Sequence, residues 1–402
     1  MEHWNQFPGK LWKSGCIIIL CIITSSYPQL LSGQKKQTYD YSIMPSPAWT
    51  NLFLRSTGWN GADGIYSITL PKDYQNELTD SNEENTLLLF SDTVIDTLVN
   101  GRPSEKGFTM IHNSVALLNG SQPEASKIHF FWKKQTDGQP SSVFKPDAPL
   151  FNQKGRDDSI YYWLGDGLSL YDRHQKSPSA KDTTLAIFAY KMTNVSTAPF
   201  GFKNIGNELL LTAQDFSILK RVTLPTIKNG TFGAGIYQEK PQTPYIYIYG
   251  VRGMHKGLVI ARTTISNLPH PKQWEFYTGN TWTRDLSRMK DITNHVSDEL
   301  SLTRTPKGGY ALIFQLDGIQ PYIGMRLAPT PYGPFGPVDT IWHCTEPGPD
   351  NKLLVYNAKA HPALSPEGGL LISYNVNSLE FIKDLKEEPT FYRPRFLLLT
   401  WK

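Results

Sequence analysis

One unit recurs five times along this chain of 402 residues. Each unit has a strand that begins with small or polar residues, then a polar turn, then a strand rich in aromatic and β-branched residues. The first strands read GADGIYSITL from Gly61, YYWLGDGLSL from Tyr161, TFGAGIYQEK from Thr231, VSDELSLTRT from Val296 and KAHPALS from Lys359. A single small sheet cannot bury its own faces, so repeated units made only of strands pack against one another. The sequence therefore predicts an all-β fold, a five-bladed β-propeller.

Grouping the strands four at a time predicts where the blades lie. They run over residues 61–133, 161–225, 231–279, 296–346 and from 356 to the C-terminus. The last group has only three obvious strands, and a propeller needs a complete last blade to leave no long exposed edge. The segment Ala48–Ser56 precedes the first blade. We expect it to complete the last blade, within a single domain over residues 34–402.

The N-terminus has the layout of a secretory signal peptide. Lys10 and Lys13 precede the apolar run 16–24, and two serines follow. We expect a signal peptide over residues 1–26, with cleavage as late as residue 33, and a secreted or periplasmic protein. The apolar run is shorter than the 18 or more residues of a membrane-spanning helix, so no stable membrane anchor is expected. A lipoprotein acylated at Cys16 or Cys21 fits less well, because bulky residues precede Cys21.

Composition narrows the possible partners. The net charge is +4 and 19% of residues are charged, with lysine and arginine scattered along the chain. We expect no nucleic-acid partner, because no basic stripe is present, and we expect a monomer. No GxSxG, HExxH, Walker or paired CxxC motif occurs, so no cofactor and no catalytic metal site are predicted. A central structural cation such as calcium is compatible with the fold. Only Cys344 follows the signal peptide, which excludes an internal disulfide.

Acidic residues lie at three of the five equivalent strand starts. If each first strand is innermost, these carboxyls converge on one face of the axis, as glycoside hydrolysis requires. Crowding of like charges raises the pKa of one of them. We predict Asp63 as base or nucleophile, Glu299 as general acid with Asp298 as the alternative, and Asp166 as a group that orients substrate or shifts a neighbouring pKa. The competing interpretation is an Asp in a turn at the first two strands and a solvated Glu at the fourth.

Further residues on the same face are predicted to bind substrate: Asp92, His112, Asn113, Arg252, Asp298, Arg326, His361 and Arg395. Asp92 could equally join His112 and Asn113 only to staple a blade, and His361 could be a hydrogen-bonded structural histidine. The arginines could clamp an anionic group or pair with acids of the blades. Candidate platforms for sugar rings are Trp59, Tyr66, Trp163, Trp282 and Trp342, although most aromatic residues of a propeller lie in the core.

Several segments resemble a known family. TGWNGADGIYSITL, LLLFSDT, HNSVAL, YNAKAHPALS, GGLLISYNVN and RPRF are similar to secreted bacterial five-bladed propeller proteins with domains of unknown function, which resemble arabinanase-like glycoside hydrolases. Some members are recognised as endo-D-arabinanases. The resemblance implies a carbohydrate substrate, with Asp63 matching the base that begins blade one and Asp166 matching the Asp that begins blade two. The general-acid Glu of those enzymes usually begins blade three, where this chain has FGAG over residues 232–235.

Three functions remain in competition. The first is a secreted glycoside hydrolase that acts on a polysaccharide or oligosaccharide, arabinan-like in substrate. The second is a non-catalytic glycan-binding propeller, which the missing acid in FGAG favours. The third is a sialidase-like enzyme, suggested by three arginines and weakened because the S-x-D-x-G-x-x-W repeats of that group do not occur.

Overall fold

The computed structural model describes residues 39–70, 84–104, 107–147, 160–170, 185–196, 200–239, 243–348 and 352–402. The predicted signal peptide lies outside these residues. Residues 40–402 form one compact unit. No helix in the described part of the chain is both long and apolar enough to cross a membrane.

Each of the five repeats forms an antiparallel sheet, and in the first four the strands lie side by side in chain order. The first contains β3 (Tyr66–Leu70), β4 (Asn85–Phe90), β8 (Ser114–Asn119) and β9 (Ile128–Phe131). The second contains β12 (Ile160–Ser169), β13 (Leu185–Asn194), β14 (Phe202–Thr212) and β15 (Ile218–Thr223). The third contains β16 (Gly230–Gln238), β17 (Tyr245–Arg252), β18 (Gly257–Thr264), β19 (Glu275–Tyr277) and β20 (Trp282–Thr283).

The fourth sheet contains β21 (Leu300–Arg304), β22 (Tyr310–Gln315), β23 (Tyr322–Ala328) and β24 (Asp339–His343). The fifth has the order β1-β27-β26-β25, from β1 (Tyr41–Pro45), β25 (Leu353–Ala360), β26 (Gly369–Ser378) and β27 (Arg395–Trp401). The prediction of an all-β fold is confirmed.

Smaller elements connect the five sheets. A further sheet joins β2 (Thr57–Ala62), β5 (Thr93–Val99), β6 (Arg102–Pro103) and β7 (Thr109–Ile111), and a short ladder joins β10 (Lys133–Lys134) to β11 (Pro140–Ser141). The helices are α1 (Pro47–Leu52), α2 (Phe381–Glu387) and the 3₁₀ turns η2 (Ile265–Asn267), η3 (Pro271–Gln273), η4 (Leu286–Arg288) and η5 (Pro362–Leu364). Gly61 and Ala62, predicted in the first strand of blade one, therefore belong to β2, and β3 begins only at Tyr66.

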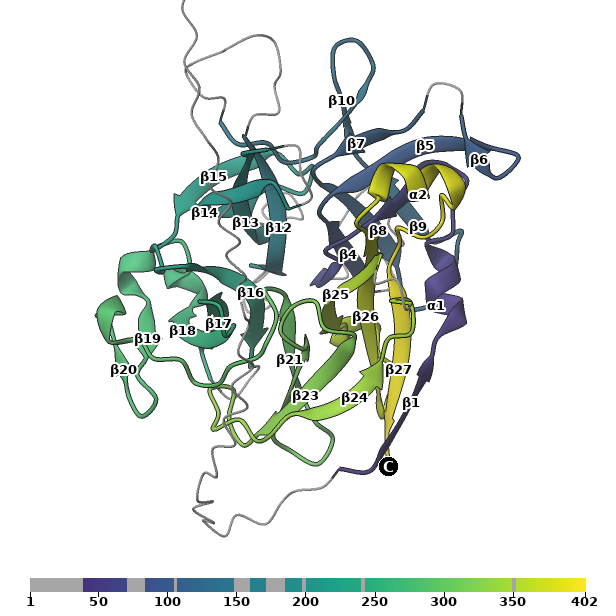
Figure 1. Ribbon diagram of the computed structural model, residues 1–402. Helices are drawn as coiled ribbons and strands as arrows, with labels where there is room; N and C mark the ends of the chain where they lie inside the picture. Colours follow the sequence, from purple (N-terminus) through teal and green to yellow (C-terminus); the bar gives the residue numbers. More distant parts are fainter. Residues whose placement is uncertain are drawn as a thin grey trace, which may run out of the picture. The chain divides into compact units, whose positions relative to one another are not determined.

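The first strands of the five sheets contact one another in chain order. β3 contacts β12, β12 contacts β16, β16 contacts β21 and β21 contacts β25. His361 follows β25, and its Nδ1 lies 3.1 Å from Oγ of Ser67 in β3, so the last sheet reaches the first. In Figure 1, β12, β16, β21 and β25 face a common centre and the later strands of their sheets lie farther out. Residues at the ends of these first strands are therefore close together.

Hydrophobic layers fill the space between neighbouring sheets. Leu87 and Leu117 of the first sheet pack with Leu164 and Ile187 of the second, and all four are fully buried. Similar layers join the second sheet to the third, the third to the fourth and the fourth to the fifth. Apolar residues of the fifth sheet also pack with those of the first and with Trp59. Each sheet buries its two faces against different neighbours, which explains why β4 and β22 are buried at every position.

The prediction that residues 48–56 form the strand that completes the last sheet is wrong. β1 pairs with β27, with Tyr41 opposite Trp401, whereas Ala48–Ser56 contains most of helix α1. Pro47 occupies the first helical position, where its fixed φ angle suits a helix and its missing N–H is not needed. Trp49, on the buried side of this helix, packs against Phe396 of β27 with ring centroids 5.8 Å apart. Tertiary packing therefore stabilises a helix in a segment whose aromatic and apolar residues suggested a strand.

Candidate active site

A cavity of about 550 Å³ is lined by four of the acidic residues that the sequence singles out. They are Asp63, Asp92, Asp298 and Glu299. Trp163, Phe200 and Phe202 line the same cavity and give it an apolar wall. Carboxyl groups beside aromatic rings are typical of sites that bind and cleave carbohydrates, because the rings stack on sugar faces and the carboxyls catalyse cleavage of the glycosidic bond.

Asp63 lies between β2 and β3, in a turn with little freedom. Its N–H donates to the carbonyl oxygen of Asp92, and its own carbonyl oxygen accepts from Ser91. A Cβ atom on Gly61 would lie 1.8 Å from the carbonyl oxygen of Tyr392, so only glycine fits beside this turn. The close backbone packing places the Asp63 side chain at the cavity.

The surroundings of Asp63 favour its protonated form. The hydroxyl of Tyr356 donates to Oδ2 of Asp63 at 2.7 Å, and this bond by itself lowers the pKa of Asp63, but other effects are larger. Burial, followed by the neighbouring charge of Asp92, raises the pKa of Asp63 to about 8, and Glu299 acts in the same direction. The Asp63 carboxyl therefore holds a proton near neutral pH.

Glu299 precedes β21 and has a different environment. Nζ of Lys359 lies 2.5 Å from its Oε2, and Nδ2 of Asn357 donates to its Oε1 at 2.8 Å. Burial raises the pKa of Glu299 above its ordinary value, while Lys359 lowers it. Both partners come from β25, which belongs to the next sheet. A glutamate from one sheet is thus held by a lysine and an asparagine from another.

Sequence reasoning missed Lys359 as a functional residue. Its side chain is only 1% exposed, and its Nζ lies 4.4 Å from the centroid of the Tyr66 ring in β3. Lysine is rarely buried to this extent unless it is paired. One signal was present: Lys359 begins the fifth repeat, whereas the other four repeats begin with an uncharged residue.

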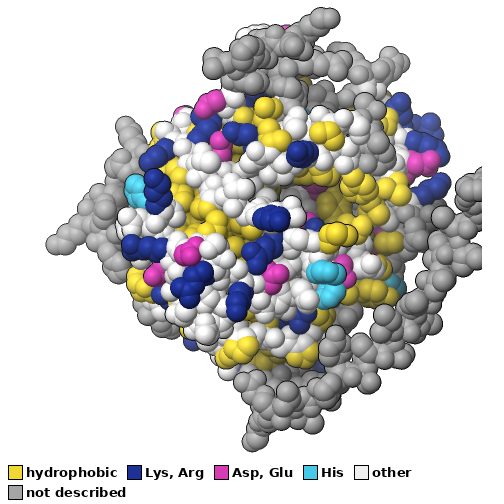
Figure 2. Space-filling model, turned by 60° about the vertical axis from the view of Figure 1, so that its left-hand side comes forward, with side chains coloured by type: hydrophobic (Ala, Val, Ile, Leu, Met, Phe, Trp, Pro, Cys, Tyr) yellow, Lys and Arg dark blue, Asp and Glu magenta, His cyan; other side chains and the backbone are white. Residues whose placement is uncertain are grey.

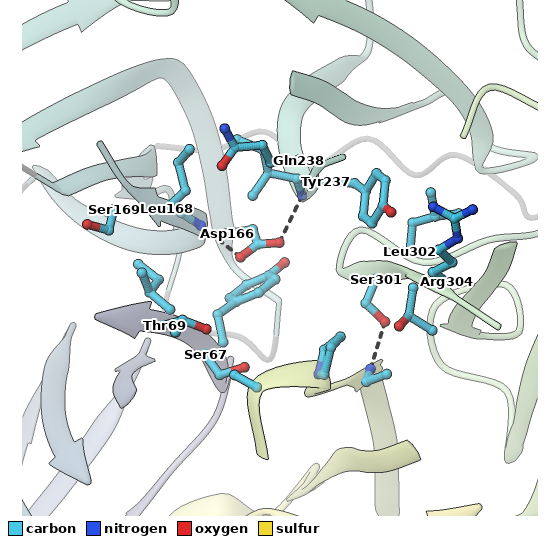
Figure 3. Close-up of a pocket in the computed structure, with 18 of the residues that line it drawn as sticks. Ser67, Thr69, Asp166, Leu168, Ser169, Tyr237, Gln238, Ser301, Leu302 and Arg304 are labelled. Carbon is cyan, nitrogen blue, oxygen red and sulfur yellow. Dashed lines mark hydrogen bonds between the residues drawn. The ribbon is translucent and has the colours of Figure 1, made fainter. Parts of the chain in front are cut away.

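Asp166 lines a second cavity, of about 410 Å³, and does not line the first. Its Oδ1 accepts the N–H of Gly167 in β12, and its Oδ2 accepts the N–H of Ile236 in β16, both at 2.8 Å (Figure 3). Burial raises the pKa of Asp166 to about 7, against the effect of these bonds and of Lys359. The three carboxyls expected in one site are therefore divided between two cavities, with Asp63 and Glu299 together and Asp166 apart.

Asp92 is fixed by two aromatic partners. Nδ1 of His112 lies 3.0 Å from its Oδ1, and Nε1 of Trp163 donates to the same oxygen at 3.0 Å. The His112 ring stacks on Tyr161 with centroids 3.7 Å apart. Asp92 and His112 do meet in space, as the sequence suggested, and Asp92 also orients Trp163 in the cavity wall.

The described residues offer no group of three or more His, Cys, Asp or Glu side chains placed to hold a metal ion. The positive charge beside the buried carboxyls comes from Lys359, which acts on both Glu299 and Asp166.

Residues 47–401 match a family described as "Domain of unknown function (DUF5005)". The chain belongs to this family. No curated protein matches it. A solved structure from Bacteroides ovatus, called a "putative hydrolase", is 20% identical with a TM-score of 0.68, over 93% of this chain and 97% of that one. The two chains therefore share a fold.

Two other solved structures superpose more loosely. A GH62 hydrolase in complex with xylotriose is 10% identical, with a TM-score of 0.43 over 87% of this chain and 99% of that one. A GH43 β-xylosidase/α-arabinofuranosidase from a compost metagenome, also in complex with xylotriose, is 12% identical, with a TM-score of 0.39 over 90% and 95%.

Two residues expected to bind substrate are structural in this DUF5005 chain. The Asn113 amide donates to the carbonyl oxygens of Phe144 and Tyr162 and accepts the N–H of Phe144. The His361 ring is fully buried, with its nitrogens beside Ser67 and Ser373. Burial lowers the pKa of His361 to about 3, so the ring is neutral. The hydrogen bonds of these side chains therefore go to the protein itself, which accounts for both residues as structural.

The three arginines predicted to bind substrate also have structural partners. Arg252 forms an ion pair with Asp291 at 2.6 Å. Arg326 donates to the carbonyl oxygens of Gly336 and Asn294. Arg395 donates to the carbonyl oxygens of Arg393 and Phe391. None of the three lines either of the two cavities described above, which removes the basis for the sialidase-like hypothesis.

Asp298 lies at the edge of the first cavity and forms an ion pair with Lys256. Its side chain is 61% exposed, which makes it a poor alternative to the buried Glu299 as a catalytic acid.

Of the three residues that form the aromatic wall of the first cavity, the sequence predicted only one. Among the predicted platforms, Trp163 lines the first cavity, whereas Trp59 is buried in the core. Phe202, which was not predicted, meets Trp163 edge to face with ring centroids 4.6 Å apart, and Phe200 lies beside Phe202. Phe202 and Phe200 remain 37% and 59% exposed, so their rings are available to a ligand.

On the face drawn in Figure 2, the described lysine and arginine side chains are interspersed with acidic and apolar ones and form no basic stripe.

Proposed function

We propose that this protein is a glycoside hydrolase of a polysaccharide or oligosaccharide. The observation that carries the proposal is that Asp63, which is partly buried, and Glu299, which is buried, come from different parts of the fold and line one cavity. Glycoside hydrolysis needs one carboxyl that donates a proton to the leaving oxygen and another that activates water or attacks carbon. Two carboxyls in unlike environments, one beside acids and one beside a lysine, suit these two tasks.

The fold we propose is a single five-bladed β-propeller over residues 34–402, closed by β1. Support comes from five repeats that form five sheets, from the contacts between their first strands, and from the pairing of β1 with β27. A propeller brings loops of all blades to one axial cavity, which suits the binding of a chain-like substrate.

The substrate class we propose is a neutral glycan, arabinan-like in the first instance. The aromatic wall of Trp163, Phe200 and Phe202 can stack on the apolar faces of sugar rings. The lysines beside the cavity are paired, Lys256 with Asp298 and Lys359 with Glu299, so they do not select an anionic sugar. We also propose export of a monomer through the signal peptide over residues 1–26, which N-terminal sequencing of exported protein would test.

The test is reducing-sugar release from plant, host and mycobacterial glycans by the purified protein. Asp63→Asn and Glu299→Gln should each lower kcat by about 100-fold or more. The melting temperature should stay within a few degrees for Asp63→Asn and fall for Glu299→Gln, which leaves the buried Lys359 without its carboxylate partner. The matched control is Glu124→Gln, because Glu124 is an exposed partner of Lys127 outside the cavity. Full activity in either active-site variant would contradict the proposal.

A second function is favoured by one observation: both carboxylate oxygens of Glu299 already have partners in Lys359 and Asn357. A non-catalytic glycan-binding propeller would tolerate this arrangement. It predicts binding on a glycan array with no reducing ends released after long incubation, and it predicts that Glu299→Gln still binds.

A further inference from the structure

The buried lysine beside Glu299 has consequences for the chemistry of the pair. Removing an ammonium or a carboxylate from water costs several kcal/mol for each ion, and a close partner of opposite charge offsets that cost. Lys359 is 1% exposed and lies 2.5 Å from Glu299, so each needs the other in its charged form. Asn357 adds a hydrogen bond to the second oxygen of the same carboxylate.

Asp63 has the opposite surroundings. The charges that act on it are those of Asp92 and Glu299, which are both acidic. The hydrogen bond from the neutral Tyr356 favours the anion, but its effect is smaller than those of burial and of Asp92. A negative charge on Asp63 would be repelled by both acids. Across one cavity, therefore, one carboxyl is stabilised as an anion and the other as an acid.

We infer that Lys359 is a positioning residue that keeps Glu299 as the carboxylate of the catalytic pair, so that Asp63 is the proton donor and Glu299 the base. This assignment rests on the proposed function, and it reverses the roles expected from the sequence. Lys359 acts through Glu299 and needs no contact with substrate.

The reaction step then balances without another reactant. The Asp63 carboxyl gives its proton to the glycosidic oxygen as the bond from that oxygen to the anomeric carbon breaks. Water forms the new bond to the anomeric carbon, and its proton passes to Glu299. Exchange with solvent returns a proton to Asp63 and removes one from Glu299, which restores the starting state.

The charged and titratable groups around the pair come from all the elements packed against it. Those acting on Asp63 are Asp92, Glu299, Tyr356 and Tyr392; those near Glu299 are Lys359, Asp298, Asp63, Asp166, Tyr66 and Tyr190. The same cavity is lined by Lys256, which pairs with Asp298, and by Asp317, while His112 lies against Asp92. Lys359 is the cation that contacts Glu299 directly. Replacing it should therefore act mainly on the carboxyls that it faces, Glu299 and Asp166.

The decisive experiment is the pH profile of kcat/KM for Lys359→Met. In the wild type the low-pH limb follows ionisation of the base and the high-pH limb follows deprotonation of the acid. Loss of the lysine should move the low-pH limb upward by about one pH unit or more and leave the high-pH limb in place. Movement of the high-pH limb instead would make Glu299 the acid and overturn the inference. Lys383→Met, which removes an exposed Lys–Glu pair, should move neither limb.

A second measurement uses the wild-type protein, so it depends neither on the folding of Lys359→Met nor on enzymatic activity. Carboxyl ¹³C resonances of the wild-type protein can be assigned with Asp63→Asn and Glu299→Gln and followed against pH. We expect Glu299 to ionise at lower pH than Asp63, and the reverse order overturns the inference. If Glu299 ionises before Asp63 but no glycan is cleaved, the proposed hydrolase and the catalytic roles are refuted while the charge states assigned to the two carboxyls stand. Failure of the proposed function can therefore be told apart from failure of this inference.

Discussion

Lys359 and Glu299 belong to different sheets, and their side chains form a buried ion pair with Nζ 2.5 Å from Oε2. Lys359 is the second-last residue of strand β25, and Glu299 precedes β21, which contacts β25. Asp63 lines the same cavity as Glu299, but its nearest charges are acidic. The difference between the two carboxyls is therefore set by contacts between sheets.

Asp63 should make the protein less stable as the pH rises. Its pKa is raised from 3.8 to about 8, so the folded state keeps a proton that the unfolded state loses. The stability that this proton provides is full below about pH 4 and is lost as the pH rises to about 8. Asp63→Asn cannot titrate, so relative to wild type it should gain stability over this range, on the order of a few kcal/mol. Urea unfolding at several pH values checks this. Equal slopes in the two proteins would contradict it, and Glu124→Gln should keep the wild-type slope.

Asp166 should matter more for stability than for activity. Its two oxygens accept N–H groups from β12 and β16, and an asparagine can replace only one of these acceptors. Asp166→Asn should therefore lower the free energy of unfolding by about 1–3 kcal/mol and lower kcat far less than Asp63→Asn does. Parallel urea unfolding and kinetics give both values. Unchanged stability with a loss of kcat as large as that of Asp63→Asn would restore the catalytic role expected from the sequence.

Phe202 should contribute to binding of sugar rings. Phe202→Ala removes an exposed ring that meets Trp163 at the cavity wall, so KM should rise by about threefold to tenfold with little change in kcat. Initial rates across a range of glycan concentrations measure this. Tyr322→Ala is the matched control, because Tyr322 is 38% exposed, close to the 37% of Phe202, and lies outside the cavity. An equal effect in both variants would show that the cavity wall has no special role.

His361 should act as a structural link between the first and last sheets. His361→Ala leaves Ser67 and Ser373 without their partner and should lower the free energy of unfolding by about 2–4 kcal/mol, with KM unchanged. Because the pKa is lowered from 6.5 to about 3, the wild type should also lose stability as the pH falls through this range, and the variant should lack that loss. A higher KM with unchanged stability would indicate substrate binding instead.

Much of the secondary structure could be predicted from the sequence, because a strand is encoded by the residues within it. Segments such as TLLLF and YIYIY alternate or repeat apolar residues over a few positions, and each forms a strand. The starting residues of the repeats also pointed to two acids that line one cavity, Asp63 and Glu299. The error at residues 48–56 arose because packing of Trp49 on β27 favours a helix there.

From the sequence alone, the pattern of apolar residues determined the strands and the all-β fold class, and the residues at the strand starts identified the candidate acids. Only the tertiary structure decided which of those acids share a cavity, that backbone amides of two strands bind Asp166, and that Lys359 binds Glu299. The physical reason is that the charge state and the direction of a buried side chain depend on neighbours from other sheets. Those neighbours lie far away in sequence, about 60 residues for Glu299 and Lys359, and no local pattern records them.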